Sequence, residues 1–371
     1  ESSVSMTIRD CDKTSVLNYH DYSVGVVAPC LTLPLTLAVV VVLPYCWYNL
    51  LSSLRKEKES SAVVSLLFGG DLLLHTIFAV CCWIQCIAMV HSNSYVGGIS
   101  ACEFQGWYVG FYVYSELLLG GCVLNTMMMS NTTIIKRIKN KVSKAGALGF
   151  VLVVYLVGAF FASLPFFNTS AYYTFGSVFC TIDLIHSKMF AILFLILFLL
   201  MMISLVFGPI RNLFTLWNTT SKEEINITDD SDNDDNIEVE IEQGSSLAND
   251  NNDNNRRRYL TMLCIGAILC TILGWSVALV MVVVGLIRNN TDSCNDNNST
   301  FGDTIGIVYG LYATMAHLQN LVHPILYGIL IRQAIPELQN IGTATTTEND
   351  VGNIKSSNNT NIVDEDKKDV G

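Results

Sequence analysis

Lysine and arginine are absent from the middles of seven long apolar runs in this 371-residue chain. Helices of a soluble bundle carry a charged face, so this absence argues against a soluble protein. Each run exceeds the ~20 residues that cross a hydrocarbon layer about 30 Å thick as a helix. The sequence therefore predicts an all-α membrane protein with seven spans, roughly at residues 24–51, 61–91, 104–129, 146–166, 189–216, 258–287 and 304–330.

Basic residues divide unequally between the two sides that seven spans would create. Of the 21 Lys and Arg, only Arg9, Lys13, Lys188 and Arg288 fall on the side opposite the C-terminus. Short cytosolic loops favour basic residues. We therefore expect residues 1–23 outside the cell, the C-terminus in the cytosol, and the plasma membrane as the location.

The net charge of −11 is concentrated rather than spread over the chain. Residues 219–255 are rich in Asp, Glu, Asn and Ser and poor in aromatics, and the tail 341–371 is similarly polar. Such segments bury too little apolar surface to order themselves, so both are expected to be disordered and cytosolic. Two interpretations stay open: a solvated spacer, or a docking segment regulated by phosphorylation.

Most of the 12 cysteines lie inside the apolar runs. Cys81, Cys82 and Cys86 have no His or carboxylate at ligand spacing, so the sequence predicts no metal site. An even number on the outer side of the membrane suggests two disulfides, with three pairings possible by counting. The four cysteines concerned are Cys11, Cys102, Cys180 and Cys294.

Asn-x-Ser/Thr sequons also occur in the expected outer loops, where they can be glycosylated. They begin at Asn168 in the second outer loop and at Asn289, Asn297 and Asn298 in the third.

Three local motifs suggest a family. The second run contains Ser65-Leu66-Leu67-Phe68-Gly69-Gly70-Asp71-Leu72-Leu73, the third opens with Cys102-Glu103-Phe104-Gln105-Gly106, and the seventh ends in His323-Pro324-Ile325-Leu326-Tyr327. With seven spans, these motifs resemble a G-protein-coupled receptor of the rhodopsin-like class A, over residues 24–340. The last motif resembles the Asn-Pro-x-x-Tyr activation motif, with His323, Pro324 and Tyr327 in its places.

The resemblance implies more than the motifs themselves show. It implies a Cys102–Cys180 disulfide, which leaves Cys11 to pair with Cys294, and a short helix along the inner membrane surface after Arg332. It implies an extracellular ligand, as yet unknown, a heterotrimeric G protein and membrane lipids as partners. Neither enzymatic activity nor nucleic-acid binding is expected.

Several family features are missing. No arginine stands at the inner end of the third run, and the sixth run has Cys270 and Trp275 but no proline. The Gln-Gly that follows Cys102 is also similar to the cyclic-AMP-receptor-like and adhesion-like branches. A polytopic transporter is the alternative from another class, although no internal repeat is visible. Retinal is not expected, because a Schiff base needs a lysine and His317 stands seven residues before Pro324.

Ionisable residues inside apolar spans are costly and usually functional, and the candidates here are Asp71, His75, Glu116, His317 and His323. We expect a polar cluster of Asp71, Ser115 or Glu116, Asn320 and His323, in which His323 hydrogen-bonds Asp71 directly. In the family this region binds sodium, so a sodium ion is expected as a possible ligand here. A structural hydrogen-bond network without an ion is the open alternative.

Aromatic and basic residues mark the two ends of the predicted bundle. The expected ligand pocket comprises Tyr112, Trp275, Tyr309, Tyr312 and His317, although aromatic stripes in membranes also serve packing. The expected G-protein face comprises Lys136, Arg137, Arg256, Arg257 and Arg258. These basic residues could instead hold the topology and contact anionic lipid.

Overall fold

The computed structural model describes most of the apolar runs and part of the loops between them. The described residues are 31–56, 59–92, 95–129, 143–167, 171, 173–176, 179–205, 240–287 and 299–334. Within them, five helices are long and apolar enough to cross a membrane. They are Leu31–Ser52, Ser65–Ser92, Lys144–Ala162, Lys188–Leu205 and Ile265–Ile287.

Helices account for nearly all of the described residues, as the apolar composition requires. Hydrocarbon offers backbone N–H and C=O groups no partners, so they must bond within the segment itself. The first helix begins at Leu31 and includes the π-helical η1 (Ala38–Val42) and α3 (Leu43–Lys56). The others are α4 (Glu59–Ser92), α5 (Gly98–Met129), α7 (Lys144–Ala162), the 3-10 helix η2 (Leu164–Phe167), Lys188–Leu205, α9 (Glu240–Ile287) and α10 (Ser299–Ala334).

The first helix widens immediately before a proline. The Leu43 N–H bonds the Ala38 carbonyl, five residues back, within a π-helical segment that leads into Pro44. Pro44 has no N–H, and its ring crowds the carbonyl four residues before it. A wider turn relieves that crowding, which explains why η1 lies there.

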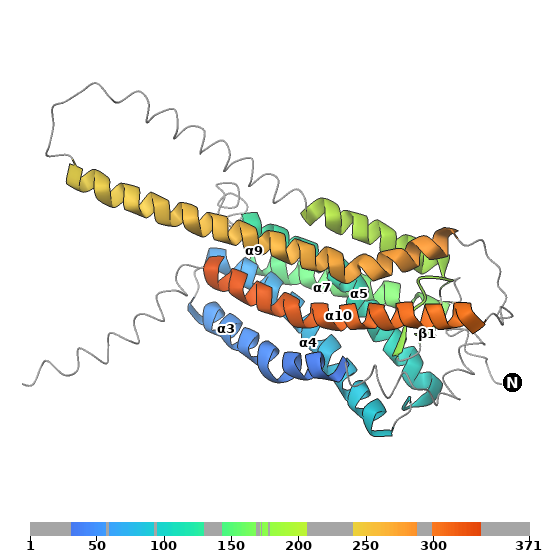
Figure 1. Cartoon of the computed structure of the whole chain (residues 1–371). Helices are drawn as coiled ribbons and strands as arrows, with labels where there is room; N and C mark the ends of the chain where they lie inside the picture. The colour runs from blue at the N-terminus through green and yellow to red at the C-terminus, as the bar shows by residue number, and fades with distance from the viewer. Residues whose placement is uncertain are drawn as a thin grey trace, which may run out of the picture. The chain divides into compact units, whose positions relative to one another are not determined.

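A two-stranded hairpin joins the fourth and fifth long helices. Strand β1 (Tyr173–Gly176) pairs antiparallel with β2 (Phe179–Ile182), with Tyr173 opposite Ile182 and Phe175 opposite Cys180. Every residue of β2 is buried. Figure 1 shows β1 at the end of the helical bundle where α10 begins.

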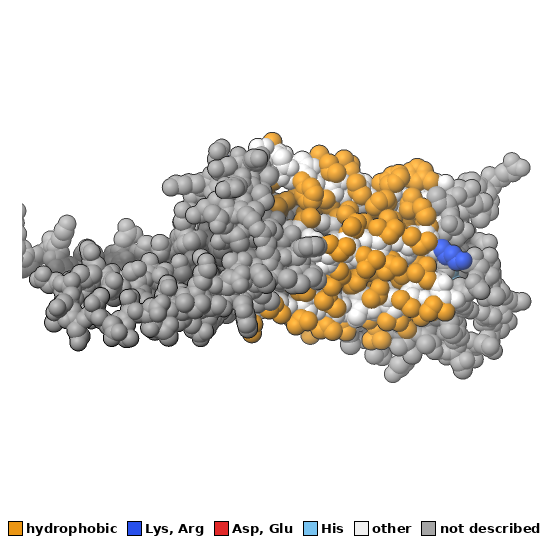
Figure 2. All heavy atoms as spheres, turned by 90° about the horizontal axis from the view of Figure 1, so that it is seen from above, with side chains coloured by type: hydrophobic (Ala, Val, Ile, Leu, Met, Phe, Trp, Pro, Cys, Tyr) orange, Lys and Arg blue, Asp and Glu red, His pale blue; other side chains and the backbone are white. Residues whose placement is uncertain are grey.

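The helices pack around α5, which contacts α4, α7, α9, α10 and both strands. The surface they leave is apolar on the face drawn in Figure 2, where the described residues form a broad band of hydrophobic side chains with one basic patch at its margin. Helix Lys188–Leu205 illustrates this, since it is apolar on its buried and its exposed face alike. Its exposed face carries Ile192, Ile196, Leu199 and Ile203, and its buried face carries Phe190, Phe194, Leu197 and Met201. A helix that is apolar all round fits a membrane span.

Glycines allow α5 to approach its neighbours closely. A Cβ on Gly106 would lie 2.7 Å from the Tyr173 ring, and one on Gly110 would lie 2.8 Å from Ile182 Cγ2. A Cβ on Gly158 of α7 would overlap with Ser115 Oγ. The small residues at 106 and 110 therefore admit the hairpin, and Gly158 admits α5 against α7.

The acidic segment 219–255 differs in part from the expected disorder. Residues 240–255 belong to α9, which is continuous from Glu240 to Ile287. Extending an existing helix adds one hydrogen bond per residue without the cost of a new nucleus, so polar residues can continue the apolar span. Residues 219–239 and the tail 341–371 lie outside the described part of the chain. The short helix expected from Arg332 is described only as far as Ala334, where it is the end of α10.

The seam between α5 and α7 predicts a stability difference between two glycines of one helix. Gly158→Ala should destabilise the fold by about 1–3 kcal/mol, because the new methyl meets both the hydroxyl and the backbone of Ser115. Gly149→Ala is the matched control, since a Cβ there has no neighbour within 4 Å. Thermal unfolding of the purified protein in detergent measures both; equal melting temperatures would contradict the tight seam.

Candidate functional site

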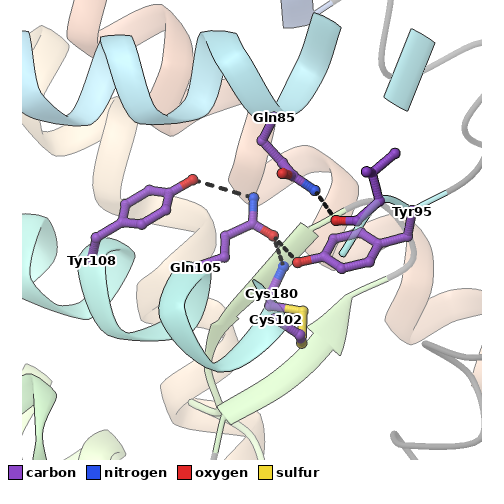
Figure 3. The surroundings of a disulfide bond; sticks show 7 residues. Gln85, Tyr95, Cys102, Gln105, Tyr108 and Cys180 are labelled. Atoms are coloured by element: carbon purple, nitrogen blue, oxygen red, sulfur yellow. Dashed lines mark hydrogen bonds between the residues drawn. A yellow bond between two sulfur atoms is a disulfide. The ribbon is translucent and has the colours of Figure 1, made fainter. Parts of the chain in front are cut away.

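A disulfide joins α5 to the hairpin at one end of the bundle (Figure 3). It links Cys102 to Cys180 across a separation of 78 residues, as the family resemblance implied. Closing a loop of that length stabilises the folded state by about 4–5 kcal/mol in the chain-entropy description. Cys11 and Cys294, the other expected pair, lie outside the described residues.

The amide of Gln105 organises the same region. Its Oε1 accepts hydrogen bonds from the Cys180 backbone N–H at 2.8 Å and from the Tyr95 hydroxyl at 3.0 Å. Its Nε2 donates to the Tyr108 hydroxyl at 3.4 Å, as Figure 3 shows. Burial raises the pKa of Tyr95 above its ordinary value, so the phenol stays protonated and available as a donor.

Asp183 ties the hairpin to α10. Its buried carboxylate accepts the backbone N–H groups of Ile185 at 3.1 Å and His186 at 2.8 Å, and the Tyr309 hydroxyl at 3.3 Å. The His186 ring lies 3.1 Å from the second oxygen. Sequence reasoning missed Asp183, although an acidic residue directly after an apolar strand and before a helix often closes a turn in this way.

The aromatic residues predicted to line a ligand pocket are all buried between the hairpin and the middle of the bundle. Tyr112 stacks on Phe78 with ring centroids 4.0 Å apart, and Phe78 also contacts the His317 ring at 5.5 Å. Trp275 meets Phe194 edge to face at 5.8 Å, and Tyr312 lies 6.3 Å from Phe179 of β2. These contacts form an aromatic layer across α4, α5, α9 and α10.

Next to that layer, three helices direct polar side chains at one another. Asp71 and His75 lie one turn apart on α4, and His75 Nε2 is 3.6 Å from both Asp71 Oδ2 and Glu116 Oε2. His323 Nδ1 on α10 is 3.1 Å from Glu116 Oε1 on α5. The side chains of these four residues are at most 1% exposed. Glu116 lies 14 residues from Cys102, about 21 Å along a helix at 1.5 Å per residue.

Two further polar residues set the protons on the two imidazoles. Asn320 Oδ1 lies 2.6 Å from His75 Nδ1, so that nitrogen donates and Nε2 carries the lone pair. Thr271 uses its only proton on the Ala267 carbonyl at 2.8 Å, so it accepts from His323 Nε2 at 3.0 Å. His323 Nδ1 makes a further hydrogen bond of 3.1 Å with Glu116 Oε1, for which either group can supply the proton. Both rings thus turn their inner nitrogens towards the carboxyl groups.

The expected polar cluster forms with changed membership. Asp71, Glu116, Asn320 and His323 are brought together, whereas the Ser115 hydroxyl faces Gly158 of α7 and is not part of the cluster. The expected hydrogen bond from His323 to Asp71 is absent, because neither Asp71 oxygen accepts one from a described side chain. Instead, His323 lies against Glu116 and His75 lies beside Asp71.

His75 and Thr271 complete the cluster, and the sequence prediction left both out. The sequence could have predicted His75, because it lies one helical turn after Asp71 and therefore on the same face of the helix. The sequence could not have predicted Thr271, since its position depends on how α9 packs against α10. From here on, the polar cluster means Asp71, His75, Glu116, Thr271, Asn320 and His323.

The seventh-run motif begins within the polar cluster at His323 and continues along α10 with Pro324. Pro324 has no N–H to bond the Asn320 carbonyl, and its own carbonyl accepts from Cys46 Sγ at 3.2 Å. The remaining predicted site residues are not described: the side chains of Tyr327, Arg256, Arg257 and Arg258, and all of Lys136, Arg137, Asn168, Asn289, Asn297 and Asn298.

Comparison with known proteins identifies the fold and nothing finer. No family model matches the chain, and no curated protein matches it either. Among solved structures it resembles the crystal structure of squid rhodopsin, with a TM-score of 0.56 and 13% sequence identity. The match covers 95% of this chain and 97% of that chain. The chain therefore has a rhodopsin-like fold, and at this identity the likeness shows the fold alone.

The hydrogen bonds of Gln105 predict a specific stability loss. Gln105→Leu leaves the Cys180 N–H and the Tyr95 hydroxyl buried without an acceptor, at a cost of about 1–3 kcal/mol for each group. Gln85→Leu is the control, because it removes a single, exposed bond to the Val96 carbonyl. Melting temperatures in detergent, with the disulfide intact in both variants, should fall clearly for Gln105→Leu only. A fall as large for Gln85→Leu would contradict the role given to Gln105.

Proposed function

We propose that this protein is a plasma-membrane G-protein-coupled receptor of the rhodopsin-like class, which passes an extracellular ligand signal to a heterotrimeric G protein. The observation that carries the proposal is the match to the rhodopsin fold along almost the full length of both chains. The proposal includes seven membrane spans, with the N-terminus outside the cell and the C-terminus in the cytosol. The excess of basic residues in the expected inner loops supports that orientation.

The polar cluster is the element through which we expect the two faces to communicate. It connects α4, α5, α9 and α10, and the Thr271–His323 hydrogen bond joins α9 to α10 directly. A movement of α9 relative to α10 must therefore break that bond. A ligand that binds one arrangement more tightly shifts the population between the two, and the cytosolic face follows.

The aromatic layer lies on the hairpin side of the polar cluster, where an extracellular ligand would arrive. Tyr112 connects the two, because its ring stacks on Phe78 and its hydroxyl lies 3.4 Å from His75 Nδ1. A ligand that displaces Tyr112 would disturb the His75 side of the cluster. Retinal chemistry is not part of the proposal, since the seventh run has no lysine for a Schiff base.

Asp71→Asn tests whether the cluster couples the two faces. The substitution keeps the size of the side chain and removes its charge, so the balance between inactive and active states should shift. We expect ligand potency or basal G-protein activation to change by about 5- to 150-fold, the usual range of allosteric coupling. A cell-based G-protein activation assay, run over a panel of small molecules at matched surface expression, measures it.

Ser115→Ala is the control for Asp71→Asn. It removes a buried polar group of the same bundle that faces Gly158 and lies outside the polar cluster. Ligand potency and basal activation should therefore stay within about twofold of the wild type, which corresponds to a free-energy change smaller than RT. Unchanged signalling in Asp71→Asn, or an equal change in Ser115→Ala, would remove the coupling role from the cluster.

The role of the cytosolic face can be tested at Arg256, Arg257 and Arg258. They lie in α9 at the inner foot of the sixth run. Replacing all three with Ala should weaken G-protein activation about fivefold or more while surface expression changes less. Lys355, Lys367 and Lys368 in the tail offer a triple variant with the same loss of charge. Reduced expression with normal activation per receptor would assign the arginines to topology and lipid contact.

A further inference from the structure

Four of the buried groups in the polar cluster have the character of metal ligands. His75, Glu116 and His323 each offer one ligand atom, and these atoms lie within 4.8 Å of one another. Asp71 adds a carboxylate whose oxygens both lack a hydrogen-bond partner and whose Oδ2 lies 3.6 Å from His75 Nε2. The four groups come from three helices, α4, α5 and α10.

The inner nitrogens of both imidazoles face carboxyl groups. Asn320 and Thr271 accept the outer N–H groups, so His75 Nε2 and His323 Nδ1 turn towards Asp71 and Glu116. The 3.1 Å contact between His323 and Glu116 is a hydrogen bond that holds one proton, and no described donor reaches the Asp71 oxygens. Acceptors facing one another in an apolar interior repel unless a proton or a cation lies between them. A divalent ion balances the charge of the two carboxylates fully.

Several separations between the donor atoms are close to those around a small tetrahedral ion. Zinc binds imidazole nitrogen at about 2.0–2.1 Å and carboxylate oxygen at about 2.0–2.2 Å, which sets ligand atoms roughly 3.4 Å apart in a tetrahedron. His75 Nε2 lies 3.6 Å from Asp71 Oδ2 and 3.6 Å from Glu116 Oε2, and His323 Nδ1 lies 3.1 Å from Glu116 Oε1. The ligand atoms of His75, Glu116 and His323 all lie within 4.8 Å of one another. Imidazole nitrogen also suits zinc and related metals, whereas alkali ions prefer oxygen alone.

We propose that the polar cluster is a binding site for a divalent transition-metal ion, zinc in the first place. His75 Nε2, His323 Nδ1 and the carboxylates of Glu116 and Asp71 are its ligands. Asn320 and Thr271 orient the two rings by accepting their outer N–H groups, the role that outer partners have around metal-bound histidines. The bound ion ties α4, α5 and α10 together, so it stabilises one arrangement of the bundle.

Metal binding can be measured on the purified full chain in detergent without any signalling partner. After chelator treatment and removal of the chelator, zinc is titrated by calorimetry, and the melting temperature is recorded with and without zinc. We expect one zinc per folded chain and a rise in melting temperature that grows with zinc concentration. Cobalt in place of zinc should give the intense visible absorption of a tetrahedral site.

Variants separate this site from surface histidines. His323→Ala and Glu116→Gln should each weaken zinc binding by at least about 100-fold, and Thr271→Val by about 10- to 100-fold through the ring orientation. His91→Ala and His186→Ala, which lie outside the polar cluster, should bind zinc as the wild type does. Melting temperatures in chelator show that each variant is folded, and Glu116→Gln keeps the size of the side chain.

Three results would overturn the proposal. The first is no zinc binding by folded wild type, and the second is binding that His323→Ala and Glu116→Gln leave unchanged. The third is stabilisation by sodium chloride alone, which would assign the cluster to a monovalent ion. The site lies within the element used in the proposed function, yet it is tested apart from it. Failed zinc binding leaves G-protein activation to be judged by its own assay, and failed activation leaves the metal site intact.

Discussion

The burial of two carboxylates and two imidazoles in one place is the constraint on which the rest of this bundle depends. Apolar surroundings cannot stabilise an isolated charge, so Asp71, His75, Glu116 and His323 must compensate one another or share a cation. Because they come from three helices, that compensation fixes how the helices sit against each other. Thr271 extends the same constraint to α9 through His323. Electrostatic interactions, as well as side-chain packing, thereby fix the relative positions of the helices inside the bundle.

The outer end of the bundle is held by a different means. There, the disulfide, the Gln105 amide and the Asp183 carboxylate attach the hairpin to α5 and α10. Gly106 and Gly110 let the strands approach α5 more closely than any side chain would permit. Between this anchored end and the polar cluster lies the aromatic layer, whose contacts are largely ring against ring. Aromatic rings can tilt against one another at a smaller cost in free energy than the buried polar contacts of the cluster can be broken.

The features that could be predicted from the sequence are those that depend on residues close together in the chain. The absence of charge within apolar runs predicts helices that suit a membrane, and five such helices are found among the described residues. The Cys102–Cys180 pair was accessible through family resemblance and is confirmed. Helical spacing could also have placed His75 beside Asp71. Thr271 and the direction of Ser115 were out of reach, because both depend on which helix packs on which face.

The polar start of α9 gives the sixth run a mechanical property. From Glu240 to Trp275, where the helix packs on Phe194, the unbroken helix measures about 52 Å at 1.5 Å per residue. If the helix pivots at Trp275, inside the bundle, its far end at Glu240 moves much further than the residues near the pivot. A tilt of about five degrees at the aromatic layer would carry the far end through roughly 4–5 Å. Because the acidic segment continues the helix, a small displacement at the aromatic layer becomes a larger displacement at its end near Glu240.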